Sequence, residues 1–307
     1  MLRKFVAFLA LIAFAIAAVP SSPRFQLTAP SADLFRHKTL KGDTVQQSFA
    51  FDNVNRRLFV AQRKNGTPTS NGDLTITQLD FSGKQLGYMH LTGFGHGVSF
   101  GAQAVGSATY LWTEVDSDAG GYGQKLARFK FTTGKTLSKS SSALTKFTPV
   151  PKATLYTAQI DPVYNRLVVR YHIPGDGKHL AVYDLAAATK GDFSNRLVDF
   201  KIPTPTTLAE SFQGYAAYGQ YLYLLWGDSY EKSGGVLNSQ VAAVDMNTGK
   251  LVQGPVMTKA GSTLSFREAE GLAIYKTAAG EVRLFLGFAS GVSGDRRSNL
   301  FYKNQLV

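Results

Sequence analysis

The stretch from Ser211 to Gly227, SFQGYAAYGQYLYLLWG, decides the fold. It contains six aromatic residues with small residues among them, and the polar Gln213 and Gly214 stand just before its most apolar part. Short apolar runs of this kind, interrupted by glycine, predict β-strands. A fold built from such strands is expected to repeat the stretch, and the rest of the chain does so.

Five segments of the chain share this arrangement and recur every 49 to 60 residues; they begin at Gln47, His96, Tyr156, Gln213 and Glu270. Hairpin turns with a glycine before the returning strand lie between them, as in Phe81-Ser82-Gly83-Lys84 and Asn247-Thr248-Gly249-Lys250. The glycine suits a turn position that needs positive φ. Five repeats of about four strands each predict an all-β protein, a five-bladed β-propeller. A jelly roll or sandwich, the competing all-β folds, predicts no repeat.

The first residue of each repeat is expected to lie at the mouth of the central channel. The innermost strand of each propeller blade lines this channel, and a small residue follows the first residue in four of the five repeats, which lets the strands crowd the axis. We therefore expect a ring of polar groups that could read a sugar or a phosphodiester, formed by Gln47, His96, Tyr156, Gln213 and Glu270. The alternative is that these groups bond only one another and channel water.

The chain begins with the features of a secretory signal peptide. Arg3 and Lys4 precede an unbroken apolar run over residues 5–18 that ends in small residues and is too short to span a bilayer. We predict a signal peptide over residues 1–18 and a single propeller domain over residues 25–307. The protein is then secreted and extracellular, without a transmembrane segment, and no signal for an oligomer is readable, so we expect a monomer.

The segment that precedes the first repeat, FQLTAPSADLFRHKTL, runs from Phe25 to Leu40. It could supply a strand that closes the ring with the last blade.

The composition favours an anionic partner. Lysine and arginine outnumber aspartate and glutamate 33 to 21, which gives a net charge of +12. Outside a cell such a field attracts wall polymers rich in phosphate or uronate, although solubility alone could also explain it. The chain carries no recognised nucleic-acid-binding module, so we expect no nucleic acid partner. The absence of cysteine excludes thiol chemistry and cysteine metal sites.

Neither a cofactor nor a metal is expected. The segment from Asp116 to Gly120 opens like a calcium-binding loop, but Ala127 stands where the bidentate glutamate should be, so a polar hairpin loop is favoured. Charged residues concentrate instead in the last repeat, where Arg296 and Arg297 could grip a phosphate or carboxylate. The alternative for these arginines is ion pairing within the blade. Trp112 could offer an apolar platform to a sugar face, whereas core packing is expected of Trp226.

Three segments resemble a known family of five-bladed propellers: EGLAIYKTAAGEVRLFLGFASGVSGDRRSNLFYK, FQGYAAYGQYLYLLWG and LWTEVDSDAGGYGQKLARFKF. The family joins receptor-binding domains of staphylococcal phages, secreted proteins similar to teichoic acid biosynthesis protein C, and bacteriocins similar to helveticin J. The resemblance covers the chain after residue 30 and implies a secreted or virion-borne propeller that engages cell-wall glycopolymers. The residues that lie on matching motifs are Gln213, Glu270, Trp112, Glu114, Arg296 and Arg297.

The sequence therefore predicts a secreted propeller that binds an anionic cell-wall or cell-surface glycopolymer at its channel mouth. A polysaccharide lyase or glycoside hydrolase is the first alternative. A hydrolase needs two facing carboxylates, and the predicted ring holds one, Glu270; Glu268 and Asp52 would approach it only in another register. A lyase could use Tyr156 and His96 beside Arg297. The second alternative is a secreted antibacterial toxin of the helveticin type. Whether the protein is an enzyme stays open at this point.

Overall fold

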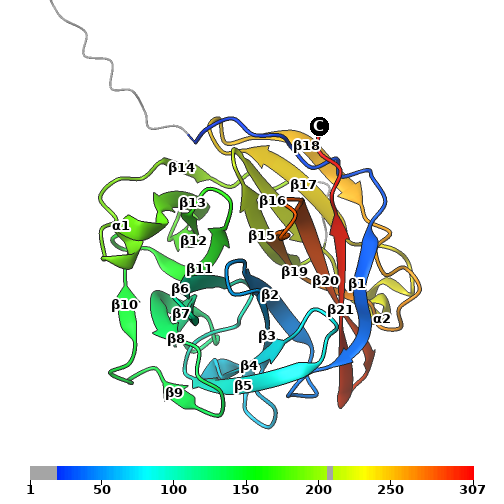
Figure 1. Ribbon diagram of the computed structural model, residues 1–307, viewed down its shortest axis with the longest axis horizontal. Coiled ribbons are helices and arrows are strands. Elements are labelled where there is room, and N and C mark those ends of the chain that lie inside the picture. Colours follow the sequence, from blue (N-terminus) through cyan, green and yellow to red (C-terminus); the bar gives the residue numbers. More distant parts are fainter. Residues whose placement is uncertain (1–18, 206–209) are drawn as a thin grey trace, which may run out of the picture.

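The computed structural model describes residues 19–205 and 210–307, and the predicted signal peptide over residues 1–18 lies outside them. The described residues form five β-sheets around a central axis, as predicted (Figure 1). The innermost strands of the five sheets are β2, β6, β11, β15 and β19, and each packs against the next in the ring. The protein is therefore a five-bladed propeller of one domain.

The strands of blades 3 and 4 follow one another directly in the chain, from the innermost outward, whereas the outermost strand of blades 1, 2 and 5 does not directly follow its neighbour in the chain. Blade 1 comprises β2 (Gln46–Asp52), β3 (Arg57–Arg63), β4 (Leu74–Leu79), β5 (Gln85–Thr92) and β9 (Thr136–Ser138). Blade 2 comprises β6 (Gly101–Val105), β7 (Ala108–Ser117), β8 (Gly123–Lys130) and β10 (Thr145–Phe147). Blade 3 comprises β11 (Thr154–Asp161), β12 (Arg166–Ile173), β13 (Gly177–Asp184) and β14 (Val198–Lys201).

Blade 4 comprises β15 (Phe212–Tyr218), β16 (Tyr221–Trp226), β17 (Gln240–Asp245) and β18 (Lys250–Met257). Blade 5 comprises β19 (Glu268–Lys276), β20 (Val282–Val292), β21 (Asp295–Lys303) and β1 (Ala32–Thr39). The helical segments are η1 (Thr69–Asn71), α1 (Leu185–Thr189) and α2 (Tyr230–Ser233). Each is short, and they connect strands rather than form a layer.

Blade 5 contains strands from both ends of the described chain. β1 pairs antiparallel with β21, so the segment before the first repeat closes the ring as the sequence suggested (Figure 1). A further bridge joins Phe25 to Leu306, and Arg24 and Val307 exchange two backbone hydrogen bonds of 2.8 Å. Opening the ring therefore requires breaking this pairing, which joins residues far apart in sequence.

The aromatic stretch from Ser211 to Gly227 forms β15 and β16 of blade 4. One face of these strands packs on blade 3, with Tyr215, Leu224 and Trp226 among the buried residues. The other face packs on blade 5 through Tyr218 and Tyr223. Both faces are buried because each blade is covered by a neighbour on either side, which explains why the stretch is apolar throughout rather than alternating. Trp226 is thus a core residue, as expected.

Small residues allow the innermost strands to meet at the axis. A Cβ atom built on Gly214 would lie 3.0 Å from the Cα atom of Gly271, and one built on Gly271 would lie 3.0 Å from the Cα atom of Ser48. The hydroxyl of Ser48 in turn donates a 2.5 Å hydrogen bond to the carbonyl of Gly97. Blades 4, 5, 1 and 2 are joined in this way, and larger side chains would push the strands apart.

A buried aspartate at the end of an innermost strand joins neighbouring blades at the opposite end of the channel. The Asp161 carboxylate accepts hydrogen bonds from the backbone N–H groups of Val163 and Tyr164 in its own turn, and from Gly219 N–H of blade 4 at 2.8 Å. Asp52 acts similarly in blade 1 and accepts a 2.5 Å hydrogen bond from the Thr109 hydroxyl of blade 2. The matching turns seen in repeats one and three are therefore latches between blades.

Replacing Asp161 with alanine is expected to lower the free energy of unfolding by about 2–4 kcal/mol, because three backbone donors lose their acceptor and one of them belongs to the next blade. Urea denaturation followed by tryptophan fluorescence measures the loss. Asp192→Ala is the control, since the Asp192 carboxylate is exposed and bonds only Ser194 within its own loop. Equal effects of the two substitutions would contradict the latch.

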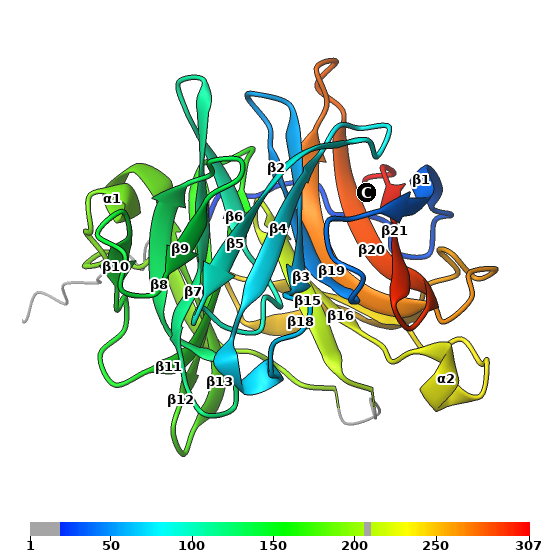
Figure 2. The same cartoon turned by 90° about the horizontal axis from the view of Figure 1, so that it is seen from below.

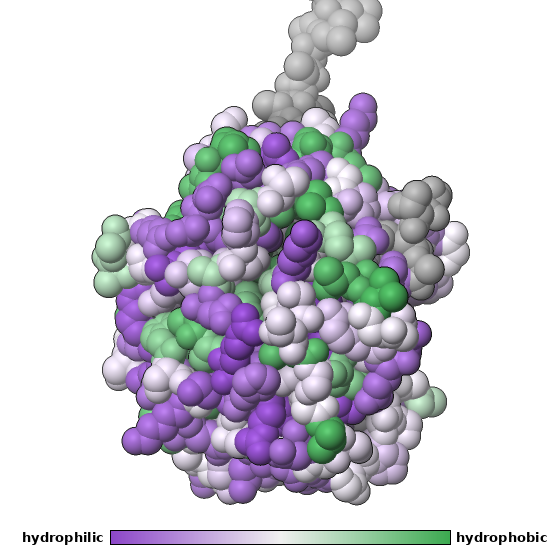
Figure 3. Space-filling model, turned by 90° about the vertical axis from the view of Figure 1, so that its right-hand side faces the viewer, coloured by the Kyte–Doolittle hydropathy of each residue, from purple (hydrophilic) through white to green (hydrophobic). Residues whose placement is uncertain are grey.

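The outer surface of blade 5 carries mixed polarity. Figure 3 shows hydrophilic and hydrophobic residues interspersed on the side of the molecule that faces the viewer. Within residues 19–205 and 210–307, no helix has the length and apolar character needed to cross a membrane. The most prominent feature for ligand binding lies instead on one face of the propeller, where the innermost strands begin.

Candidate functional site

A cavity of about 940 Å³ opens at the end of the channel where the innermost strands begin. All five blades contribute to its walls, together with α2 and the residues around η1. Figure 2 shows that α2 and the hairpin between β12 and β13 project on the same side of the propeller. The volume is large enough for several sugar or polyol units.

β-bulges shape the rim of this cavity. One extra residue interrupts the pairing of the innermost strand near its start in four blades, between Gln46 and Ser48, Thr154 and Thr157, Phe212 and Gly214, and Ala269 and Leu272. A bulge redirects a side chain that the regular pleat would otherwise place between blades. It is the physical reason why polar residues can stand at the head of strands that are otherwise apolar.

Five of the eight predicted ligand-binding residues line this cavity: Gln47, His96, Gln213, Glu270 and Arg296. They come from blades 1, 2, 4 and 5, so the structure brings together groups that lie up to 249 positions apart in the chain. The Gln213 side-chain amide donates a 2.9 Å hydrogen bond to the Gly227 carbonyl. Its carbonyl oxygen has no donor in the described residues. Whether these five residues bind a ligand stays a prediction.

Two of the predicted ligand-binding residues, Trp112 and Tyr156, are buried outside the cavity, so these two predictions are wrong. Trp112 is fully buried between blades 2 and 3, stacks on Phe147 at 5.2 Å, and donates its indole N–H to Gln103. Tyr156 is also fully buried, and its hydroxyl donates to the Val150 carbonyl at 2.6 Å. The bulge in blade 3 is the reason for the second error: it turns Leu155 and Thr157 toward the cavity and Tyr156 into the core.

Arg297 does not line the cavity either. Its guanidinium forms an ion pair with Asp295 at 2.5 Å on the rim of blade 5, which is the alternative that the sequence left open. The three residues proposed for a lyase, Tyr156, His96 and Arg297, are therefore not assembled in one site. Asp52 lies at the far end of its strand and does not approach the cavity.

Arg170 and Lys178, which sequence reasoning missed, form the cationic centre of the cavity. They lie on neighbouring strands of blade 3, β12 and β13, and both line the cavity. In the part of the chain that the structure describes, neither the Arg170 guanidinium nor the Lys178 ammonium has a hydrogen-bond or ion-pair partner. Burial and the nearby Arg170 charge lower the pKa of Lys178 to about 8. Glu114 is near enough for its charge to act on Arg170, but no carboxylate contacts either cation in the described residues, and burial favours the neutral form of Glu114. Two like charges held together without a contacting counterion favour a bound anion.

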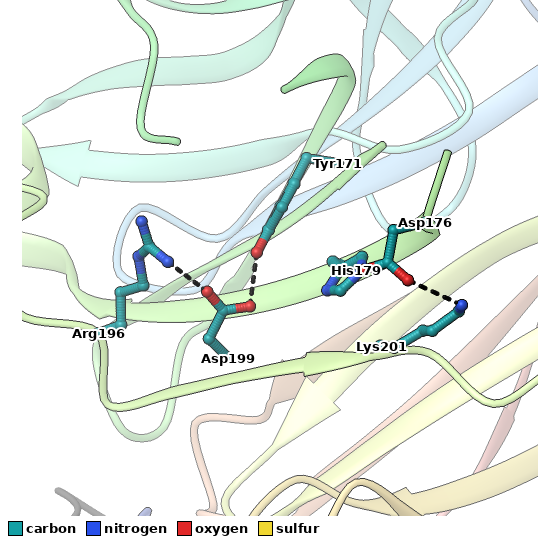
Figure 4. Close-up of polar contacts among 6 residues, drawn as sticks. All are labelled: Tyr171, Asp176, His179, Arg196, Asp199 and Lys201. Carbon is teal, nitrogen blue, oxygen red and sulfur yellow. Dashed lines mark hydrogen bonds and ion pairs between the residues drawn. The ribbon is translucent and has the colours of Figure 1, made fainter. Parts of the chain in front are cut away.

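Two outer cations of the same blade, Arg196 and Lys201, are paired with carboxylates, unlike Arg170 and Lys178. Figure 4 shows Asp199 between Arg196 and the Tyr171 hydroxyl, with both contacts at 2.5 Å. It also shows Asp176 beside His179, at 2.8 Å, and Lys201, at 2.9 Å. None of these residues lines the cavity. Blade 3 thus pairs these two outer cations and leaves the two that line the cavity without a contacting carboxylate.

A further cation, Arg63, lies on the blade 1 side of the cavity. The Arg63 guanidinium lies 2.6 Å from Nε2 of His96 and donates a 2.9 Å hydrogen bond to the Thr69 hydroxyl. Burial, together with the Arg63 charge, lowers the pKa of His96 to about 4, so the imidazole is neutral at physiological pH. Within residues 19–205 and 210–307 no carboxylate pairs with Arg63. Its charge therefore also faces the cavity.

The exposed aromatic platform is Tyr122 rather than Trp112. The Tyr122 ring stacks on His96, with centroids 4.9 Å apart and an interplanar angle of 7°, and 41% of the residue is exposed. Phe212 offers a second ring to the cavity and lies under the Arg170 guanidinium at 4.2 Å. Aromatic faces beside hydrogen-bonding groups are typical of sites that hold an amphipathic ligand.

Four carboxyl groups line the cavity, where the predicted ring held one: Asp43, which accepts a 3.0 Å hydrogen bond from the Asn65 amide, and Glu114, Glu268 and Glu270. Glu114 is 1% exposed, and its carboxylate accepts backbone hydrogen bonds from Gly97 and Gly123 at 2.7 and 2.6 Å; burial nevertheless raises the pKa of Glu114 to about 7. This group organises the loop around His96. Glu268 and Glu270 on β19 differ from it, because neither carboxyl group has a hydrogen-bond or ion-pair partner in the described residues.

Glu270 is 5% exposed, and its surroundings favour the neutral form of its carboxyl group. Burial raises the pKa of Glu270 well above its usual value, the nearby Glu268 raises it further, and Arg63 opposes the shift. Burial also raises the pKa of Glu268. Among the described residues, no group of three or more potential metal ligands is gathered in one place, so the two glutamates form no metal cluster. They instead give blade 5 two hydrogen-bonding acids that face the cavity.

The sequence carried weak signals for the residues that were missed. Arg170 interrupts the apolar part of the strand RLVVRYHI, whose other arginine, Arg166, is its first residue, and a charged residue within a buried strand is a candidate for a site. Lys178 begins the next strand, at the tip of a hairpin, and no pattern distinguishes it from other exposed lysines. Tyr122 stands in a polar loop rich in glycine.

Comparison with known proteins identifies the fold and its relatives. A family model described as the phage 5-bladed beta propeller receptor binding platform domain matches residues 45–302. The protein named "Putative major teichoic acid biosynthesis protein C" of Bacillus subtilis (strain 168) is 27% identical over 288 residues, which cover 90% of this chain and 63% of that protein. The chain thus spans less than two thirds of that relative's length.

Solved structures show the same architecture. The tail fiber of Staphylococcus aureus phage P68 superposes with a TM-score of 0.71 at 22% identity, covering 92% of this chain and 53% of the fiber chain. An alpha-L-arabinofuranosidase from Lactobacillus brevis superposes with a TM-score of 0.52 at 10% identity, covering 86% of this chain and 92% of the enzyme. At these identities the likeness concerns the fold alone.

Proposed function

The chain belongs to the family of phage five-bladed β-propeller receptor-binding platform domains, and from this premise we propose that it binds an anionic cell-wall glycopolymer in the cavity at the channel mouth. The family name concerns receptor binding, and the Bacillus subtilis relative is named for teichoic acid, a phosphate-containing wall polymer. Both descriptions agree with the chemistry of this cavity.

The observation that carries the proposal is the unpaired cation pair of Arg170 and Lys178. A phosphate or carboxylate between them would supply the counterion that the described residues lack. Arginine binds such groups through two parallel hydrogen bonds, and lysine adds a point charge. Arg63 could contact a second anionic group of the same polymer, because it faces the same cavity from blade 1.

Neutral groups of the cavity suit the sugar or polyol part of such a polymer. Gln47 and Gln213 offer amide donors and acceptors, and Glu270 offers a carboxyl group whose neutral form, favoured by burial, can also donate. Tyr122 and Phe212 provide apolar surfaces for the faces of a sugar ring. The polymer would therefore be read by charge at its anionic groups and by hydrogen bonding between them.

Secretion fits this role. The predicted signal peptide over residues 1–18 would deliver the propeller to the compartment where wall polymers are found. The net charge of +12, or two less after loss of Arg3 and Lys4, would speed the encounter with a polyanion, and the effect would weaken as salt rises. We therefore propose that the protein is secreted.

Co-sedimentation with purified cell walls tests the proposed function. Walls are prepared intact and after chemical removal of their anionic polymer, and the mature chain is added at low and high salt. We expect sedimentation with intact walls, weaker at high salt, and loss of sedimentation after stripping. The supernatant is assayed for reducing ends and unsaturated uronate. Released sugar would favour the hydrolase alternative, and killing of a sensitive strain would favour the toxin.

Replacing Tyr122 with alanine is expected to weaken binding of the wall polymer about 5-fold, because one aromatic contact contributes about 1 kcal/mol. Tyr122→Phe is the matched control: it keeps the ring that stacks on His96 and removes only the hydroxyl, so its affinity should stay near that of the wild type. Isothermal titration calorimetry with a soluble polymer fragment measures both. An alanine variant that binds as well as the phenylalanine variant would remove Tyr122 from the site.

A further inference from the structure

The cavity is divided by charge into two halves. Blades 1 to 3 contribute Arg63, Lys64, Arg170 and Lys178, whose side chains have no carboxylate partner in the described residues. On the other side, β19 contributes Glu268 and Glu270; Asp228 and Glu231 lie near Glu268, and so do the cations Lys232 and Arg296, which also line the cavity. An anion-binding site that needed only positive charge would not place two free carboxyl groups in the same cavity.

Glu270 is the informative residue of the acidic half. It is 95% buried, yet its carboxyl group has no donor or cation within contact distance in the part of the chain that the structure describes. The charged groups nearest to it are Glu268 of the same strand and Arg63 of blade 1. Its carboxyl oxygens are open to the cavity rather than sealed in the core, so a group this confined, without a protein partner of its own, points to a partner that arrives with the ligand.

The nearby cations do not supply that partner. The Lys232 ammonium of α2 bonds the Asp228 carboxylate at 3.0 Å, and Arg296 lies over the Phe266 ring and within 3.9 Å of Glu231. Their contacts are thus with carboxylates other than Glu268 and Glu270, although both charges also act on Glu268 from a distance. Glu270, on which only the more distant Arg63 acts, therefore has no contacting cation among the described residues.

We infer that Glu268 and Glu270 form a subsite for a positively charged ammonium group carried by the same anionic glycopolymer. The inference rests on the proposed function, and it specifies the ligand as a polymer whose repeat carries both an anion and an amine. The anion would lie between Arg170 and Lys178, and the amine would lie against β19 across the cavity. The polarity of the cavity then fixes the orientation of the repeat, because reversal would place like charges together.

Amine binding has a measurable consequence at Glu270. Without ligand, burial and the nearby Glu268 raise the pKa of Glu270 and so favour its neutral form. An ammonium beside it favours the ionised form, so the bound state loses a proton. Binding of an amine-bearing polymer should therefore release protons, whereas binding of the same polymer without its amines should not.

Calorimetric titration of the whole chain with four synthetic glycerol phosphate oligomers tests the inference. The first carries aminoacyl esters, and the second is the same oligomer after mild alkali has removed them. The third carries glucosamine, and the fourth carries N-acetylglucosamine. We expect at least one amine-bearing oligomer to bind about 10-fold more tightly than its amine-free partner, with an enthalpy that depends on the ionisation enthalpy of the buffer. Which pair differs tells whether the amine comes from an ester or from an amino sugar.

Glu270→Gln is the variant for this test and Glu281→Gln its control. Glutamine keeps the size of the side chain and removes its charge, so the preference for the amine should fall to about 1-fold and proton release should disappear. Glu281 lies on blade 5 outside the cavity, where Arg283 pairs with it at 2.6 Å, and its substitution should change neither quantity. If Glu270→Gln did not fold, proton release by the wild-type chain would still decide the question.

Three results would overturn the inference in distinguishable ways. Equal affinity of the wild-type chain for amine-bearing and amine-free oligomers, without proton release, would overturn the ammonium subsite and leave the proposed function standing. Failure to bind any of the oligomers or the intact wall would overturn both. Hydrolysis of the sugar-bearing oligomers would also overturn it, since Glu268 and Glu270 would then act as catalytic acids.

Discussion

Replacing both Arg170 and Lys178 with glutamine is expected to weaken binding of an anionic wall polymer at least 100-fold. Each residue would lose a charge-assisted contact of about 1.5–3 kcal/mol, and about 1.4 kcal/mol corresponds to a 10-fold change in affinity. The two side chains are the only unpaired cations that blade 3 directs into the cavity, among its described residues. Titration calorimetry at fixed salt measures the loss, and the salt dependence of the remaining affinity should also become shallower.

The matched control removes the same charge from the same blade. Arg196→Gln with Lys201→Gln changes two exposed cations that pair with Asp199 and Asp176 outside the cavity (Figure 4). We expect this variant to lose less than about 3-fold in affinity, through the general field alone. A similar loss in both double variants would mean that net charge, rather than the cavity, carries the binding. Thermal unfolding of each variant verifies that the fold is retained.

Replacing Gly271 with valine is expected to lower the free energy of unfolding by about 3 kcal/mol or more. The residue has a φ of +94°, which costs a β-branched residue about 1–3 kcal/mol. Its new Cβ atom would also lie 3.0 Å from the Cα atom of Ser48, so the innermost strands of blades 5 and 1 would have to separate. Because these strands start at the cavity, binding should fall together with stability.

Gly280→Val separates the cost of backbone strain from the cost of the clash at the axis. Gly280 has a φ of +87°, and a Cβ atom there meets nothing within 4 Å. Its substitution therefore carries the backbone strain without the clash at the axis, and we expect it to cost about 1–3 kcal/mol. Urea denaturation of both variants gives the comparison. Equal losses would contradict the close packing of the strands at the axis.

The fold could be predicted from the sequence because its determinants are local and repeated. The stretch over Ser211–Gly227 is apolar on both strand faces, and its recurrence revealed the number of blades. Even the closing strand could be anticipated, because β1 is the strand that precedes the first repeat. The blades of a propeller resemble one another, so an error in aligning one repeat does not change the predicted architecture.

The site was predicted only in part because it depends on single-residue changes of direction. Gln47, Gln213 and Glu270 were found because each is a polar residue at the head of an apolar strand. Tyr156 holds the same position in the repeat, but the bulge of blade 3 sends its side chain into the core. Sequence period alone does not give the position of a bulge, and one extra residue reverses which side chains face the channel.

Residues of the second and third strands were missed for a different reason. Arg170 and Lys178 reach the cavity over the innermost strand, from a hairpin whose length the repeat does not determine. Trp112 illustrates the converse: its type suited a sugar platform, yet alternation along β7 places it between two blades. Residue type suggests the chemistry of a site, whereas strand direction decides which residues take part in it.

A crystal structure of the protein with a short fragment of the anionic glycopolymer is the decisive test of whether the polymer binds at the channel mouth. We expect the fragment in the 940 Å³ cavity, with a phosphate or carboxylate in contact with the Arg170 guanidinium and the Lys178 ammonium. A fragment bound only on the outer surface of the blades, with the cavity holding solvent alone, would contradict it.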